Sequence, residues 1–278
     1  MTIRAVLFDL GDTLWHFPQM PPTQTIRGET MRRIGGVLGT WGQAFDGAFR
    51  FLGRDIRLAV EVADREAYES DCVSPDFAEV CREVVRAKGR EISREQAEQL
   101  WDAWNLGGLM LGRTMYDDAF ETLDWLRDHG YRIGCVTNRV FGGPRFAEEL
   151  RELGLDRYFE SMLVSCDFGY MKPHPKIYEQ ALAEMRIEAG ETAMVGDSLK
   201  ADVQGSQALG MTAVLRSVRK HDPPHEAEQV GEVPPETPAT RAQTGRALGE
   251  FGGGEGVAPD YTIYTLRELT ELPIFAQA

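Results

Sequence analysis

Basic residues are scarce in this chain of 278 residues, which has 30 Lys and Arg against 44 Asp and Glu and a formal net charge of −14 at pH 7. Proteins that bind nucleic acids neutralise backbone phosphates with clusters of Lys and Arg. The sequence contains no basic stripe of this kind. We therefore expect no nucleic-acid partner.

Long apolar runs are also missing. The first apolar run, residues 3–8, ends at Asp9 and has no small-residue cleavage pattern after it. A membrane-spanning helix needs about 20 consecutive apolar residues, and a secretory signal needs a cleavable apolar segment. We therefore expect a cytoplasmic protein with no membrane partner.

Cysteine is rare and shows no metal-binding or redox spacing. None of the four cysteines lies in a Cys-x-x-Cys pattern. A chain of this length that is 42% hydrophobic can bury a core large enough to fold without disulfides. We expect four reduced thiols, which are Cys72, Cys81, Cys135 and Cys166.

Short β-rich runs that end in polar residues alternate with helical stretches from about residue 115 onward. Gly130 and Gly154 follow two of these helical stretches, and Pro175 is positioned to open another that runs to about Met185. This alternation predicts an α/β fold with a parallel sheet and helices on both faces. The predicted strands are residues 3–8, 131–136, 162–164, 193–195 and 212–215.

Residues 15–113 lack this alternation and are mostly helical in composition. Ser93 and Gln96 form a predicted capping box at the start of one helix. Because this helical insert directly follows the first strand, we expect it to cover the carboxyl edge of the sheet, where open α/β folds bind ligands. The alternative is an ordinary helical layer on one face. The predicted division is a core of residues 1–14 and 114–278 and a helical cap of residues 15–113.

Residues 217–258 interrupt the core. Pro and Gly make up 12 of these 42 residues, and the few large apolar side chains cannot offset the entropy of ordering such a length. We expect a flexible insert here. After it, residues 261–264 are predicted to form an edge strand, and Leu266, Leu269 and Leu272 a short terminal helix.

Polar side chains follow four of the predicted strands. The carboxyl ends of parallel strands meet at one edge of a sheet, so these side chains are expected to converge. Taken singly, an Asp or Lys after a strand is more often a turn, cap or solvated residue. The four sets are Asp9 in Phe8-Asp9-Leu10-Gly11-Asp12-Thr13-Leu14, then Thr137-Asn138, then Lys172 in Lys172-Pro173-His174-Pro175, and Gly196-Asp197-Ser198-Leu199-Lys200-Ala201-Asp202.

In this order the four sets resemble the four motifs of the haloacid dehalogenase-like (HAD) hydrolases, and in particular the subgroup with a helical cap between the first and second motifs. The resemblance covers the chain except residues 217–258. It implies a Rossmann-like core with a cap, and a Mg²⁺-dependent phosphatase of a small phosphorylated metabolite. In such an enzyme Asp9 attacks phosphorus and forms an aspartyl-phosphate.

The resemblance also implies a role for each matching residue. Asp9, Thr137 and Lys172 are the expected catalytic residues, and Thr137, Asn138 and Lys172 are expected to bind the phosphate. The expected role of Asp202 is to orient Lys172 or the waters on the metal. The ligands expected for Mg²⁺ are the Asp9 carboxylate, the Gly11 carbonyl, Asp197 and water.

The first motif departs from the family at residues 11 and 12, where the usual Asp and Gly are exchanged. In the family pattern the Asp side chain at position 11 protonates the leaving group, and its carbonyl binds the metal. Gly11 retains only the carbonyl. General acid–base catalysis contributes about 10²- to 10⁴-fold in rate. Asp12 is a possible substitute acid/base, although we favour a role in closing its own loop.

Two other functions remain open. In a 2-haloacid dehalogenase, Asp9 would attack carbon without a metal, but that branch typically lacks the Gly196-Asp197 pair. A HAD-fold binding or regulatory protein with weak or no catalysis is the other alternative. The sequence does not identify the substrate or the oligomeric state. Cap arginines that can meet an anionic leaving group are Arg27, Arg32, Arg50 and Arg54.

Overall fold

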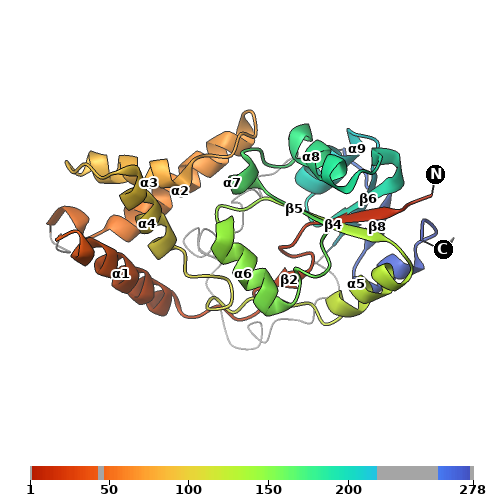
Figure 1. Ribbon diagram of the computed structural model, residues 1–278, viewed down its shortest axis with the longest axis horizontal. Coiled ribbons are helices and arrows are strands. Elements are labelled where there is room, and N and C mark those ends of the chain that lie inside the picture. The colour runs from red at the N-terminus through yellow and green to blue at the C-terminus, as the bar shows by residue number, and fades with distance from the viewer. Residues whose placement is uncertain (1, 43–46, 218–255, 276–278) are drawn as a thin grey trace.

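The computed structural model describes residues 2–42, 47–217 and 256–275. A bundle of helices from the first third of the chain lies beside an α/β unit that contains both described ends of the chain (Figure 1). The predicted insert at 217–258 lies almost entirely outside the described residues. Within the described residues, no helix is both long and apolar enough to cross a membrane.

The α/β unit is built on a six-stranded parallel sheet with the order β5-β4-β1-β6-β7-β8. The first strand is central, since Ala5 pairs with Arg132 on one side and Thr192 on the other. The predicted α/β class is confirmed, and the predicted edge strand forms as β8. The strands are β1 (Ala5–Phe8), β4 (Arg132–Thr137), β5 (Ser161–Val164), β6 (Thr192–Gly196), β7 (Thr212–Arg216) and β8 (Tyr261–Ile263).

Helices cover both faces of the sheet because each central strand is apolar on both sides. In β1, Val6 and Phe8 pack with α5 (Ala119–Asp128), α6 (Gly143–Leu153) and the 3₁₀ helix η5 (Arg267–Glu271). Ala5 and Leu7 pack on the other face against α8 (Pro175–Met185). This arrangement is the one expected for strands buried on both faces.

The local end signals act as predicted in several helices. Pro175 opens α8, and Gly154 ends α6 in the left-handed conformation. The predicted short terminal helix is present, and residues 267–271 form it as the 3₁₀ helix η5. The helix after Ser198 begins as a π-helical segment, η3 (Leu199–Gln204), and continues as α9 (Gly205–Gln207). Short elements elsewhere in the core are α7 (Ser165–Phe168) and η2 (Ala189–Glu191).

The helical insert has its own apolar core, formed by α1 (Thr23–Thr40), α2 (Leu52–Glu69), α3 (Phe77–Ala87) and α4 (Arg94–Trp104), with the 3₁₀ helix η1 (Gly47–Phe49). The predicted capping box of Ser93 and Gln96 is present at the start of α4. Phe141, from the loop after β4, enters this core and stacks on Trp101 at 4.4 Å between ring centroids. The insert is therefore anchored to the α/β unit by apolar packing.

Two further connections join the insert to the α/β unit. The entering and leaving segments pair as a short antiparallel ribbon of β2 (Trp15–His16) and β3 (Thr114–Met115). After α2, the main chain bonds to the segment before Lys172: Ser74 N–H donates to Gly169 O at 2.9 Å, and Met171 N–H donates to Cys72 O at 2.9 Å. We call these two main-chain bonds the 72–74 bridge.

Candidate active site

Asp9 lies at the carboxyl end of β1, in the middle of the sheet. Its main-chain N–H donates to Val195 O at 2.9 Å, which extends the pairing with β6 by one residue. The residue is only 8% exposed. A strand that is fixed on both sides therefore presents this carboxylate at the sheet edge with little freedom to move.

Lys172 joins the first and fourth motifs. Its Nζ donates to Asp9 Oδ1 at 2.7 Å and to Asp202 Oδ1 at 2.6 Å, and the residue is 1% exposed. Burial alone would lower the pKa of Lys172, but the carboxylates of Asp202 and Asp9 outweigh burial and raise the pKa above its ordinary value. This lysine is therefore a fixed cation and not a solvated loop residue.

The Asn138 side chain holds the main chain of Lys172. Its Nδ2 donates to Lys172 O at 2.8 Å, and its Oδ1 accepts from Lys172 N–H at 2.7 Å. The predicted phosphate contact of Asn138 is untested by this geometry, which adds a positioning role that was not predicted. Thr137 is 2% exposed and ends β4, the strand next to β1.

The turn after β6 places Asp202 against the main chain. Asp202 Oδ2 accepts from Ser198 N–H at 2.9 Å. A Cβ atom added to Gly196 would lie 2.2 Å from Asp202 Cγ, so only glycine permits this close approach. Burial raises the pKa of Asp202, and Asp9 adds to this while Lys172 opposes it; the net direction is upward.

The pKa of Asp197 shows that this part of the site has an excess of negative charge. Burial and the carboxylates of Asp9, Asp202 and Asp12 raise its pKa well above the ordinary value for Asp, and Lys172 opposes only part of this effect. No group of three His, Cys, Asp or Glu side chains in the described part of the chain is arranged as a metal site. The oxygen donors of Asp9, Asp197 and the main chain nevertheless fit Mg²⁺, which keeps several waters.

The exchanged pair in the first motif has a clear backbone consequence. Asp12 adopts the left-handed conformation with φ 53°, where glycine is favoured, whereas Gly11 does not. The Asp12 N–H donates to Trp15 O at 2.7 Å, and its carbonyl accepts from Arg216 Nη1 at 2.7 Å. A Cβ added to Gly11 would meet only Trp15 Nε1, at 4.0 Å. The position of the missing acid therefore has room for a side chain.

Tyr68, near the end of α2, is a residue of the insert that the sequence did not indicate. It is 2% exposed, and Lys200 Nζ lies 4.2 Å from its ring centroid. Burial raises the pKa of Tyr68, and the charge of Asp202 adds to this effect. The insert thus contributes a neutral phenol close to the fourth motif.

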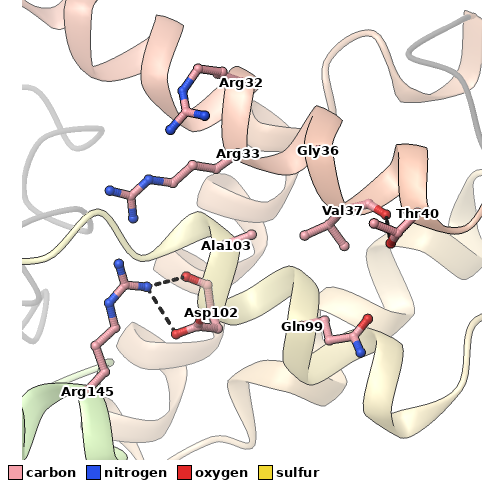
Figure 2. A pocket seen from close by; sticks show the side chains of 9 residues that line it. All are labelled: Arg32, Arg33, Gly36, Val37, Thr40, Gln99, Asp102, Ala103 and Arg145. Atoms are coloured by element: carbon pink, nitrogen blue, oxygen red, sulfur yellow. Dashed lines mark hydrogen bonds and ion pairs between the residues drawn. The ribbon is translucent and has the colours of Figure 1, made fainter.

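Among the described residues, the cap arginines that could meet a leaving group form no ion pair with a residue of the four motifs. Arg27, Arg50 and Arg54 are exposed, and Arg32 lines a surface cleft of about 560 Å³ between α1, α4 and Arg145 of α6 (Figure 2). Asp9, Thr137, Lys172, Asp197 and Asp202 do not line this cleft. Its arginines are also paired with carboxylates, since Arg32 and Arg33 share Glu29 and Arg145 pairs with Asp102. The cleft is therefore separate from the carboxyl edge of the sheet, where these five residues lie.

Several known proteins are similar to this chain in sequence. A ribulose-1,5-bisphosphate 5-phosphatase from Halopiger xanaduensis is 33% identical over 96% of this chain and 98% of its own. A glyceraldehyde 3-phosphate phosphatase from Pyrococcus abyssi is 40% identical over 34% of this chain. The chain spans about 40% of the length of the glyceraldehyde 3-phosphate phosphatases that it matches.

Solved structures share the fold. The L-2-haloacid dehalogenase from Xanthobacter autotrophicus superposes with a TM-score of 0.55 at 21% identity, and the two chains cover 99% and 100% of each other. A HAD phosphatase from Thermococcus onnurineus gives 0.52 at 24% identity, with 97% of both chains covered. The sequence pattern of the haloacid dehalogenase-like hydrolases matches residues 3–210. This chain therefore belongs to the haloacid dehalogenase-like hydrolases.

Proposed function

We propose that this chain is a Mg²⁺-dependent phosphomonoester hydrolase that acts on a small phosphorylated metabolite. The observation that carries the proposal is the buried Asp9 carboxylate, which a fixed Lys172 cation holds through Oδ1. Its Oδ2 has no hydrogen bond among the described residues and is available for attack. Relatives named as phosphatases of ribulose 1,5-bisphosphate and of glyceraldehyde 3-phosphate support the substrate class.

The reaction divides into two displacements at phosphorus. Asp9 Oδ2 forms a bond to phosphorus while the ester P–O bond breaks, which gives an aspartyl-phosphate and an alkoxide. Because residue 11 lacks a side chain, the alkoxide takes its proton from water. A second water then attacks phosphorus, the bond to Asp9 breaks, and inorganic phosphate leaves.

The other predicted residues stabilise negative charge or hold those that do. Lys172 and Thr137 would bind the phosphoryl oxygens, with the Asn138 main chain or side chain beside them. Asp202 would keep Lys172 in place, as its 2.6 Å bond to Nζ supports. We also propose that residues 15–113 form a cap over this edge, because Tyr68 and the 72–74 bridge bring the insert to the loop before Lys172.

Asp9, the Gly11 carbonyl and Asp197 would hold Mg²⁺. When bound, the ion supplies positive charge that offsets the repulsion between the carboxylates and the phosphate. This part of the proposal is supported by the upward pKa shift of Asp197, which burial and three neighbouring carboxylates cause.

Hydrolysis of p-nitrophenyl phosphate tests the function, because p-nitrophenolate needs little acid assistance to leave. We expect Mg²⁺-dependent phosphate release. Metal-independent chloride release from 2-chloropropionate, without phosphate release, would instead indicate a dehalogenase. Folded protein that binds Mg²⁺ but hydrolyses no phosphomonoester would indicate a binding protein.

Metal binding has a readout independent of turnover. We expect Mg²⁺ to raise the melting temperature of the wild type but not of Asp197→Asn. Without metal, Asp197→Asn is expected to be more stable than the wild type, because it removes one of several repelling carboxylates. A carboxyl group with a raised folded pKa loses stability as the pH rises above its unfolded pKa of about 4. The advantage of Asp197→Asn should therefore grow from pH 4 to pH 8. A constant or shrinking difference would contradict the site.

The double variant Gly11→Asp with Asp12→Gly restores the order of the family motif and should restore the general acid at position 11. Residue 11 has room for a side chain, and residue 12 already has the backbone conformation that glycine prefers. We expect kcat for alkyl phosphates to rise by about 10²-fold and kcat for p-nitrophenyl phosphate by less than about threefold. Asp12→Gly alone is the control and should produce neither gain. Equal gains on both esters would show that the proton already comes from another group.

A further inference from the structure

Two buried arginines lie beside the first motif, outside the constellation described above. Arg113 immediately precedes β3, and Arg139 follows Thr137-Asn138. Arg113 is 5% exposed and Arg139 is 6% exposed. The guanidinium carbon of Arg113 lies 4.3 Å from the Trp15 ring centroid, and that of Arg139 lies 4.1 Å from the ring centroid of Phe146.

Of the two cations, Arg113 has a carboxylate partner. Glu149 of α6 pairs with Arg113 at 2.7 Å, and it also accepts from the Gly108 N–H. The Nε of Arg139 donates to Phe141 O at 3.2 Å, and within the described part of the chain Arg139 has no carboxylate within ion-pair distance. A buried charge without an opposite charge is costly. The cluster therefore holds one more positive charge than it neutralises.

The imbalance affects Arg139 directly. Burial lowers its pKa to about 10, and the charge of Arg113 contributes to this effect. The side chain therefore still carries its charge at neutral pH. The three guanidinium nitrogens of Arg113 are sealed from solvent, whereas the Nη atoms of Arg139 are not among the sealed atoms. Since the Nη atoms of Arg139 also form no hydrogen bond with another described residue, Arg139 is the member of the pair with donors left for a ligand.

Arg139 is fixed at the catalytic edge by its main chain. Its N–H donates to Ser165 Oγ at 2.9 Å, and its carbonyl accepts from the same hydroxyl at 3.1 Å. The negative charges of Glu149 and Asp9 oppose the effect of burial on the pKa of Arg139. Trp15, whose ring centroid lies 5.8 Å from the Arg139 guanidinium carbon, has its Nε1 next to Gly11. The cation therefore lies between the nucleophile loop and the helical insert.

We propose that Arg139 determines substrate specificity by binding a second anionic group, a carboxylate or a second phosphate, on the part of the substrate that is not transferred. The inference rests on the proposed phosphatase function and narrows its substrate class. A guanidinium presents paired N–H donors that match either anion. Charge balance favours this role, because such a substrate supplies the negative charge that the cluster lacks.

Two matched pairs of substrates test the effect of the second anionic group apart from that of the rest of the molecule. Phosphoglycolate and 2-hydroxyethyl phosphate differ in a carboxylate, whereas ribulose 1,5-bisphosphate and ribulose 5-phosphate differ in a phosphate. We expect the wild type to prefer the doubly anionic member of at least one pair by 10-fold or more in kcat/KM, as charge-assisted hydrogen bonds of about 1.5–3 kcal/mol imply. The pair that shows the preference identifies the anion. No preference in either pair would overturn the proposal.

Substitution at Arg139 then tests whether this residue causes the preference for the doubly anionic substrate. Arg139→Met should abolish it while leaving kcat/KM for p-nitrophenyl phosphate within about threefold, and Arg139→Lys should retain part of it. Arg145→Met is the matched control, because Arg145 is a surface arginine paired with Asp102, and it should change neither quantity. Equal losses on both members of a pair would mean that Arg139 has only a structural role.

A binding measurement keeps this inference separate from the proposed chemistry. In the Asp9→Asn variant, which should bind without turnover, phosphoglycolate or ribulose 1,5-bisphosphate should raise the melting temperature more than its singly anionic counterpart. The difference should disappear on adding Arg139→Met, and it should shrink on adding Arg139→Lys, which replaces the first double variant if that one does not fold. Absence of hydrolysis by the wild type would refute the phosphatase alone, whereas equal thermal shifts would refute the role of Arg139.

Discussion

Replacing Asp9 with Asn should reduce the turnover of p-nitrophenyl phosphate by at least about 10⁴-fold, because removal of a nucleophile abolishes the covalent route. An amide oxygen carries no full negative charge and does not form the acyl phosphate. It can still accept the hydrogen bond that Lys172 now donates to Asp9 Oδ1. Release of inorganic phosphate at saturating substrate measures the loss.

The fold should survive this substitution. We expect the melting temperature to change by only a few degrees, because one charge is lost from a cluster with excess negative charge. Asp128→Asn, on the exposed end of α5, is the matched control and should leave turnover unchanged. Rapid acid quenching should trap a phosphorylated form of the wild type and none of Asp9→Asn. An Asp9→Asn protein that keeps a tenth of wild-type turnover would exclude Asp9 as the nucleophile.

Replacing Lys172 with Met should impair both catalysis and stability. The charge that stabilises the phosphoryl oxygens disappears, and we expect a loss of about 10²- to 10³-fold in kcat. The substitution also leaves Asp9 and Asp202 as buried carboxylates without their cation. Removing one partner of a buried ion pair destabilises a protein by about 3–5 kcal/mol. Chemical denaturation and steady-state kinetics measure the two effects.

Lys176→Met gives a matched control from the same region. The Lys176 side chain is exposed and, among the described residues, donates only to Tyr170 Oη, so its loss should change the free energy of unfolding by less than about 1 kcal/mol. Turnover should remain close to that of the wild type. A Lys172→Met protein as stable as Lys176→Met would mean that the two carboxylates do not depend on Lys172.

The fold and much of the candidate site could be predicted because their signals are local. Apolar strand runs, end residues such as Gly154 and Pro175, and polar side chains directly after strands are each written within a few residues. Parallel topology then brings strand ends together. The contact between Asp9, Lys172 and Asp202 follows from these rules, although the residues are far apart in the chain.

Other features depend on packing between distant segments and left no such signal. Tyr68 belongs to a helix of the insert, and its place near Asp202 depends on how that helix meets the core. The pairing of Arg113 with Glu149, and the surplus charge of Arg139, likewise require the tertiary structure. Arg139 had one local indication, since it directly follows Thr137-Asn138. The short terminal helix at residues 267–271 was predicted, but its 3₁₀ form was not specified, because a short leucine repeat fits either kind of helix.

The 72–74 bridge has a consequence for how such caps diversify among relatives. Its bonds join main-chain atoms, so a point substitution deletes one of them only by placing proline, which has no N–H, at Ser74 or Met171. A helical insert transplanted from a relative would have to bring an extended segment able to pair with residues 169–171. Without that segment, the backbone leading to Lys172 would lose two of its fixed partners. We therefore expect the insert and the segment that leads to Lys172 to be inherited together among relatives.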